Sequence, residues 1–261
     1  RRVAARPAGR PGAPRAVVGL LTGCVQSAFF SHVSAATARV LALEGCEVVV
    51  PAGQGCCGAL SSHAGRDRQA RTLARRTVAA FTRSGVDTVV TDVAGCGSAM
   101  KGYARLLADD PRWAAPAAAL AGKVRDITEV LTELEPIAPR HPVPLTVAYH
   151  DACHLAHGQR VTRQPRELLA GIPELRLVEV PDGGTCCGSA GVYNLLQREP
   201  AAQLGDRKAA AILGLDPDLV VAGNPGCLLQ IDAALRRAGE SLPLRHTVEL
   251  LDISLRGGLR G

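Results

Sequence analysis

Short apolar runs rich in valine and leucine recur along the chain, and glycine or proline bounds each of them. They are AVVGLLTG (16–23), EVVVP (47–51), TVVTDVAG (88–95), LTVAYHDA (145–152), LRLVEVP (175–181) and LVVAGNPG (219–226). Runs this short and β-branched are typical of buried parallel strands. Stretches long enough for helices separate them, for example 32–44, 66–84 and 199–213. The alternation predicts an α/β fold of βαβ units with right-handed crossovers and mainly parallel sheets.

The order of runs and cysteines in the first half repeats in the second, so the chain is internally duplicated. Cys24 lies 32 residues before Cys56, and Cys153 lies 33 residues before Cys186. Each half ends in a similar phrase, RDITEVL (125–131) and RHTVELL (245–251), which we expect to be helical. We therefore predict a first cysteine-rich repeat, a proline-rich linker, a second repeat and a short tail. Their bounds are 16–131, 132–144, 145–255 and 256–261.

Composition and charge exclude two classes of protein. The chain is 47% hydrophobic, which is enough for a core, but it has no apolar run near the roughly 18 residues that a membrane span needs. The net charge of +6 includes five arginines and no acid in residues 1–15, so 6 − 5 = +1 remains for the rest. We expect no nucleic-acid partner. Residues 1–15 are predicted to be a flexible leader, with an Arg-rich transit peptide as the alternative.

Nine cysteines dominate the chemistry. Their number is odd and no signal peptide is present, so metal-binding thiolates in a reducing, cytoplasmic compartment are favoured over disulfides. Eight of the nine form four matched pairs, with one member in each half. Each of the eight lies just past the carboxyl end of a predicted strand, where open α/β sheets place their ligands. We predict two metal sites, formed by Cys24, Cys56, Cys57 and Cys96 and by Cys153, Cys186, Cys187 and Cys227. Cys46 has no repeat partner, and we expect it only to pack in the core.

The adjacent cysteines of the two CCG sequences favour a polynuclear centre. Their Cα atoms lie about 3.8 Å apart, closer than an ordinary disulfide prefers, whereas neighbouring thiolates can bind different irons of one cluster. Helices beginning just after Cys24, Cys153 and both CCG turns would direct partial positive charge at an anionic cluster. A structural zinc site is the alternative, but zinc sites favour CxxC spacing, which is absent here.

Other polar residues near the cysteines give weaker signals. His150, His154 and His157 flank Cys153 and could bind metal or carry a proton, although histidines near a turn are more often hydrogen-bonded scaffolding. Tyr193 and Asn224 are candidates to contact the ligands without binding the metal themselves. Ser189 belongs to no Ser/His/Asp arrangement, and we expect no catalytic residue in the chain. Neither a GxGxxG turn nor a Walker A loop appears, so no nucleotide site is expected.

Several phrases in the sequence resemble the cysteine-rich "CCG" family. They are GCCGAL (55–60), AGCGSAMKGY (94–103), CCGSAGVYNLL (186–196), GNPGCLLQI (223–231) and HTVELL (246–251). The family includes heterodisulfide reductase, lactate-utilisation and glycerol-3-phosphate dehydrogenase subunits, and these phrases are most similar to the glycolate oxidase iron–sulfur subunit. The fullest family motif ends each repeat in CxxC, with five cysteines per site. Ala99 and Gln230 stand at those last positions here, so the resemblance implies conventional [4Fe–4S] clusters, or a cluster in one half alone.

The resemblance also implies a function and partners. It implies an electron-transfer subunit of a flavin-dependent 2-hydroxy-acid (glycolate) dehydrogenase, with FAD on a flavoprotein partner and a further electron acceptor. It allows peripheral association with the inner face of the membrane. A lactate-utilisation or heterodisulfide-reductase-like protein is the alternative. The glycolate oxidase subunit carries a ferredoxin-like region before its CCG half, and residues 1–261 contain none. We expect either the C-terminal portion of such a subunit or a shorter relative.

Overall fold

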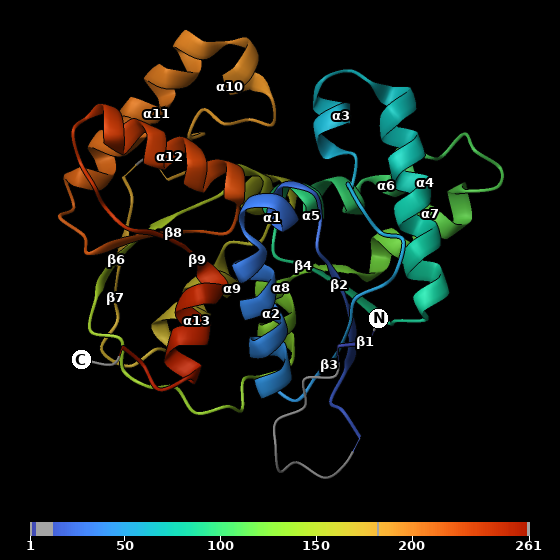
Figure 1. The fold of residues 1–261 in the computed structure, drawn as a ribbon, viewed down its shortest axis with the longest axis horizontal. Helices are drawn as coiled ribbons and strands as arrows, with labels where there is room; N and C mark the ends of the chain where they lie inside the picture. Colours follow the sequence, from blue (N-terminus) through green and yellow to red (C-terminus); the bar gives the residue numbers. More distant parts are fainter. Residues whose placement is uncertain (1, 4–12, 182, 260–261) are drawn as a thin grey trace. The chain divides into compact units, whose positions relative to one another are not determined.

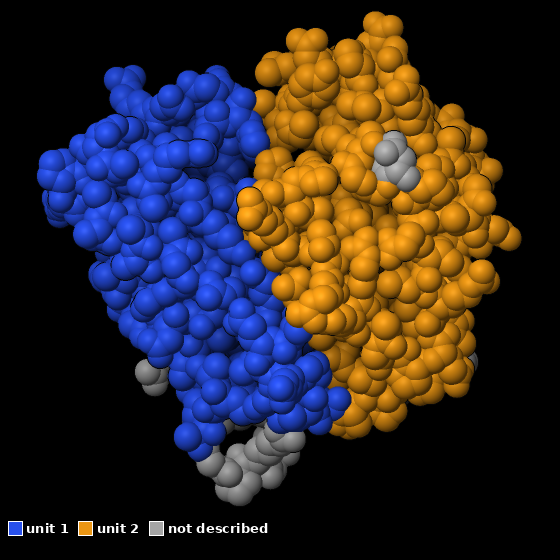
Figure 2. Space-filling model, turned by 180° about the vertical axis from the view of Figure 1, so that it is seen from behind, with its two compact units in different colours: residues 1–138 blue, residues 139–261 orange. Residues whose placement is uncertain are grey.

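The chain divides into two compact units, Arg1–Ala138 and Pro139–Gly261, coloured separately in Figure 2. The structure is a computed structural model and describes residues 2–3, 13–181 and 183–259. The boundary between the units lies within the proline-rich stretch 132–144. Each unit has its own sheet and helices (Figure 1), and each is described by itself.

The sheet of the first unit has four parallel strands and one antiparallel edge strand, in the order β1-β3-β2-β4-β5. The strands are β1 (Arg2–Val3), β2 (Val17–Leu21), β3 (Glu47–Val49), β4 (Thr88–Thr91) and β5 (Val124–Asp126). The helices are α1 (Val25–Phe29), α2 (Ser31–Leu43), α3 (Ala59–His63), α4 (Asp67–Ser84), α5 (Ala94–Lys101), α6 (Tyr103–Leu106), α7 (Ala114–Lys123) and α8 (Ile127–Glu133). In Figure 1, α2 and α8 lie on one side of this sheet, and α4 and α7 lie on the other.

The second unit repeats this arrangement with four parallel strands in the order β7-β6-β8-β9. The strands are β6 (Thr146–His150), β7 (Arg176–Glu179), β8 (Leu219–Ala222) and β9 (Leu244–His246). The helical segments are the π-helical turn η1 (His154–Gly158), α9 (Arg163–Ala170), α10 (Tyr193–Leu196), α11 (Arg198–Leu213), α12 (Pro225–Arg237) and α13 (Thr247–Leu255). The α9 and α13 helices contact each other, as do α11 and α12.

The two sheets place equivalent residues at equivalent positions, which confirms the predicted α/β duplication. The last residue of β2, Leu21, pairs with Thr91 of β4, and the last residue of β6, His150, pairs with Ala222 of β8. Burial explains the apolar runs, because every residue of β8 and all but the first of β2 are buried. In the first unit, Leu21 belongs to the same packed cluster as Cys57 and Cys96.

Two local expectations differ from the structure. No helix follows the second CCG turn directly, because Ala190 and Gly191 have positive φ and delay α10 to Tyr193. The phrases at 125–131 and 245–251 are not wholly helical, because each begins in a strand, β5 or β9, before a helix.

The structure describes only part of the predicted leader. Arg2–Val3 pair with β3 as an antiparallel strand, and the Arg15 guanidinium donates to the main-chain oxygens of Leu134 and Glu135. Residues 1 and 4–12 of the leader, and 260–261 of the tail, lie outside the described residues. No helix in the described part of the chain is long and apolar enough to cross a membrane.

Candidate metal centres

The first unit brings its four repeated cysteines to the carboxyl edge of its sheet. Cys24 follows β2 and occupies the position just before α1, while Cys96 lies in α5, which follows β4. Cys56 and Cys57 lie in the loop between β3 and α3. The Cys24 side chain contacts Cys56, and the Sγ atoms of Cys57 and Cys96 lie 3.2 Å apart in the core. The four thiols therefore form one continuous row.

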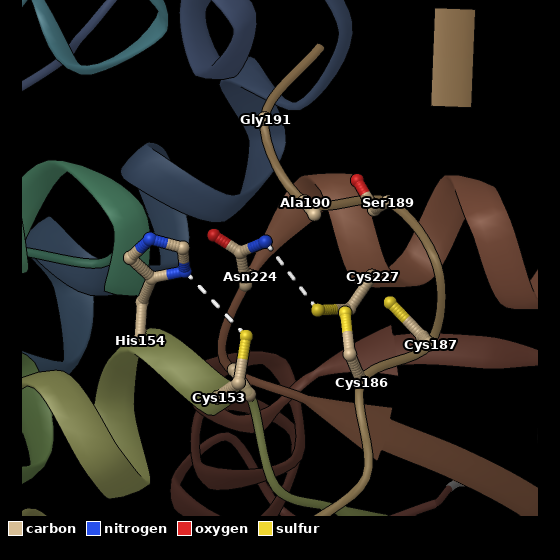
Figure 3. Close-up of a pocket in the computed structure, with 10 residues that line it drawn as sticks. Cys153, His154, Cys186, Cys187, Ser189, Ala190, Gly191, Asn224 and Cys227 are labelled. Atoms are coloured by element: carbon tan, nitrogen blue, oxygen red, sulfur yellow. Dashed lines mark hydrogen bonds between the residues drawn. The ribbon is translucent and has the colours of Figure 1, made fainter. Parts of the chain in front are cut away.

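The second unit forms the same row at the equivalent edge. Cys153 contacts Cys186, and Cys187 contacts both Cys186 and Cys227. Figure 3 shows the four sulfur atoms gathered together, with the loop through Ser189 and Ala190 beside them. The cysteines line a pocket that opens to solvent. In each unit the CCG pair includes one half-buried and one buried thiol.

The glycine of each CCG turn allows the backbone to turn back on the first cysteine. Gly58 and Gly188 have φ of +87° and +92°, a region that favours glycine. Their N–H groups donate to the Sγ atoms of Cys56 and Cys186 at 3.4 and 3.3 Å. Hydrogen bonds of this kind to cysteine sulfur are a feature of iron–sulfur sites.

The packed thiols cannot all ionise by themselves. Contact with Cys186, followed by burial, raises the pKa of Cys153. Contact with Cys186 and Cys227, together with burial, raises the pKa of Cys187, whereas contact with Cys187 lowers the pKa of Cys227. Neighbouring thiolates repel one another. A bound cation offsets this repulsion and deprotonates a coordinating thiol. Four converging sulfurs with N–H donors to sulfur thus fit an iron–sulfur cluster, whose ligands are thiolates.

The remaining candidates have different surroundings. His154 Nδ1 lies 3.5 Å from Cys153 Sγ, and His157 Nε2 lies 3.1 Å from the Gly184 carbonyl oxygen. Asn224 donates through Nδ2 to Cys227 Sγ at 3.5 Å, so it touches a candidate ligand. Tyr193 begins α10 and is exposed.

Ser189 and Cys46 are both buried. Ser189 lines the pocket of the second unit. Burial raises the pKa of the Cys46 thiol to about 11. A thiol with so high a pKa, packed in the core, behaves as a small apolar side chain.

Two further residues support the CCG turns. The buried Tyr103 hydroxyl donates to the Cys57 carbonyl oxygen at 2.5 Å and so holds the first CCG turn. Gln230 accepts from Asn194 and donates to the Ala201 carbonyl oxygen, joining the segments around the second CCG turn. Gln230 replaces a motif cysteine and has a structural role instead. The motif comparison singled out Gln230, whereas the role of Tyr103 rests on a tertiary contact that no spacing indicates.

A family model for the cysteine-rich domain named CCG matches residues 18–101 and 147–232, one match in each unit. The chain belongs to the CCG family. Each match covers the strands and loops that carry one row of four thiols. The family, which the sequence motifs indicated, is thereby confirmed.

Several curated proteins of the CCG type are similar to the chain. The probable glycolate oxidase iron–sulfur subunit of Bacillus subtilis is 38% identical over 90% of this chain and 54% of its own length. A fumarate reductase (CoM/CoB) subunit of Methanothermobacter marburgensis is 36% identical over 92% of this chain and 47% of its own. The chain thus spans about half the length of these two relatives. Lactate utilization protein A of Oceanobacillus iheyensis is 29% identical over 93% of this chain and 99% of its own.

A solved structure agrees with the fold. The crystal structure of a hypothetical protein from Helicobacter pylori matches with a TM-score of 0.59 over 95% of this chain and 50% of that one. Its sequence is 12% identical, so the likeness concerns the fold alone.

Proposed function

We propose that this CCG chain is the electron-transfer part of a flavin-dependent oxidoreductase that oxidises a 2-hydroxy acid, with glycolate as the substrate class. Two iron–sulfur centres relay electrons from a flavoprotein partner to a further acceptor. The observation that carries the proposal is the pair of four-thiol rows, one at the carboxyl edge of each sheet. The names of the relatives, a glycolate oxidase iron–sulfur subunit and a lactate utilization protein, support the substrate class.

The proposed ligands are the eight repeated cysteines. Cys24, Cys56, Cys57 and Cys96 hold the centre of the first unit, and Cys153, Cys186, Cys187 and Cys227 hold that of the second. When bound, such centres supply one-electron transfer at potentials set by charge, burial and hydrogen bonds to sulfur. The chain's own residues place the sulfurs, exclude water from the buried members of each row and donate hydrogen bonds to the half-buried members.

The chain carries no recognised flavin or nicotinamide motif, so the hydride chemistry belongs to the partner. We place the complex in the cytoplasm, with peripheral association with the inner face of the membrane as the alternative. The acceptor is a membrane-bound or soluble electron carrier.

The test is reconstitution with the flavoprotein subunit under anaerobic conditions. The chain alone is expected to give no glycolate or lactate oxidation with an artificial dye. With the flavoprotein present, either hydroxy acid should reduce the flavin, and the visible absorbance of the iron centres should then bleach in a stopped-flow record.

Two results would contradict the proposal. Turnover of a hydroxy acid by the chain alone would make it the catalyst. Partner-free reduction of a heterodisulfide would favour the heterodisulfide-reductase-like alternative.

A further inference from the structure

The two units differ in the last residue of the strand that precedes the first cysteine of each row. In the first unit this residue is Leu21, which shares a packed cluster with Cys57 and Cys96. In the second unit the equivalent final strand residue is His150. Its donor atom lies within 4.8 Å of the Sγ atoms of both Cys187 and Cys227. The repeat has thus exchanged an apolar side chain for a nitrogen donor beside two candidate ligands.

His150 has the burial expected of a metal ligand rather than of a solvated histidine. It is 1% exposed. Its ring contacts the Cys227 thiol and helps lower the pKa of that thiol, and among the described residues neither ring nitrogen has a nitrogen or oxygen partner. A buried imidazole without such a partner is costly, because its polar atoms lose their hydrogen bonds to water. A coordinate bond to a metal would replace those lost interactions.

The other histidines nearby do not share this position. The His154 ring faces Cys153, the half-buried end of the row, and the His157 ring faces a backbone carbonyl. Gln230, which stands where the full motif has a cysteine, is engaged by Asn194 and Ala201. His150 is therefore the additional donor at the buried end of the second row.

We propose that His150 binds iron through a ring nitrogen in the second unit, in place of one of the four thiolates assigned to that centre above, so that the chain holds one all-thiolate centre and one mixed thiolate–imidazole centre. The inference rests on the proposed iron–sulfur function. Histidine ligation raises the reduction potential of an iron–sulfur centre above that of an all-cysteine one. The centre of the second unit consequently accepts electrons first, and that of the first unit has the lower potential.

The experiment uses the iron-loaded protein grown with ¹⁵N-histidine and poised in its paramagnetic forms. Pulsed EPR should detect a directly bonded nitrogen on one of the two centres, namely the one with the higher potential in a redox titration. His150→Leu, which copies Leu21 of the first unit, should abolish that coupling and leave the other centre's signal unchanged. His150→Cys should restore a protein ligand and lower the potential of the same centre. His154→Leu is the matched control and should retain the coupling.

The outcomes separate the two proposals. Iron and sulfide in the expected amounts without nitrogen coupling would overturn the role of His150 and leave the electron-transfer function standing. Coupling that survives in His150→Leu but disappears in His154→Leu would also overturn it. Stoichiometric zinc without sulfide would overturn both.

Discussion

At the residue scale, Tyr103 fixes the first CCG turn through one buried hydrogen bond to the Cys57 carbonyl oxygen. Tyr103→Phe leaves this buried acceptor unpaired, which should lower the free energy of unfolding by about 1–3 kcal/mol. In the second repeat Ala234 stands at the equivalent position, so the effect should be confined to the first unit. Urea unfolding and iron release to a chelator measure both effects. Equal loss of iron from both units would contradict this interpretation.

A second residue-scale prediction concerns Asp92, which is fully buried directly after β4 and accepts a hydrogen bond from Thr37 at 3.0 Å. Burial raises the pKa of this carboxyl from 3.8 to about 6. The folded protein therefore binds the proton more tightly than the unfolded chain, and the free energy of unfolding falls as pH rises from about 4 to 6. A shift of this size corresponds to about 3 kcal/mol, and the cost is present in full above pH 6.

Asp92→Asn should remove this dependence. Relative to the wild type, the variant should gain stability between pH 4.5 and pH 7.5, as measured by urea unfolding at the two pH values. A difference between the two proteins that does not change with pH would show that Asp92 does not titrate in this range.

At the element scale, the two CCG turns depend on glycine to different degrees. A Cβ at Gly188 would lie 2.3 Å from the Ala201 carbonyl oxygen in α11, and a Cβ at Gly58 would lie 3.1 Å from the Ala70 carbonyl oxygen. Gly188→Ala should therefore displace α11 and lose the iron of the second unit, whereas Gly58→Ala should cost less. Gly65, with φ of +68° and open space around it, is the control. Gly65→Ala should cost only about 1–2 kcal/mol of backbone strain.

Thermal unfolding and iron content of the three alanine variants measure this order. Equal stability and equal iron content of Gly188→Ala and Gly65→Ala would contradict this prediction, because the close approach of α11 to Gly188 would then not affect stability.

The elements themselves were largely predictable, because strands buried on both faces leave short apolar runs and the duplication supplies each assignment twice. Segment 199–213 was expected to be helical and forms α11, Arg198–Leu213. The short strands β5 and β9 were not predicted. Each has three residues directly before a capped helix, and three residues are too few to show the alternation of apolar and polar positions that identifies a strand. The candidate ligands could be read from the repeat, but the position of His150 at Cys187 and Cys227 depends on packing between β6 and α12, which no spacing encodes.

At the scale of the whole molecule, each unit contains a complete row of thiols, so the two centres should load separately. Cys57→Ser should reduce iron and sulfide by about half and leave the signals of the second unit intact. Cys46→Ser is the matched control, since both thiols are buried in the first unit and Cys46 lies outside the row. It should destabilise the fold and retain the full amount of iron. Loss of half the iron in Cys46→Ser would assign Cys46 to the site.

The most direct test of the account is metal and sulfide analysis of the anaerobically purified chain. Two four-iron clusters predict about eight iron and about eight acid-labile sulfide per chain, with broad visible absorbance that bleaches on reduction. Stoichiometric zinc without sulfide, or neither iron nor sulfide after anaerobic reconstitution, would contradict the claim that the two rows of cysteines are iron–sulfur centres.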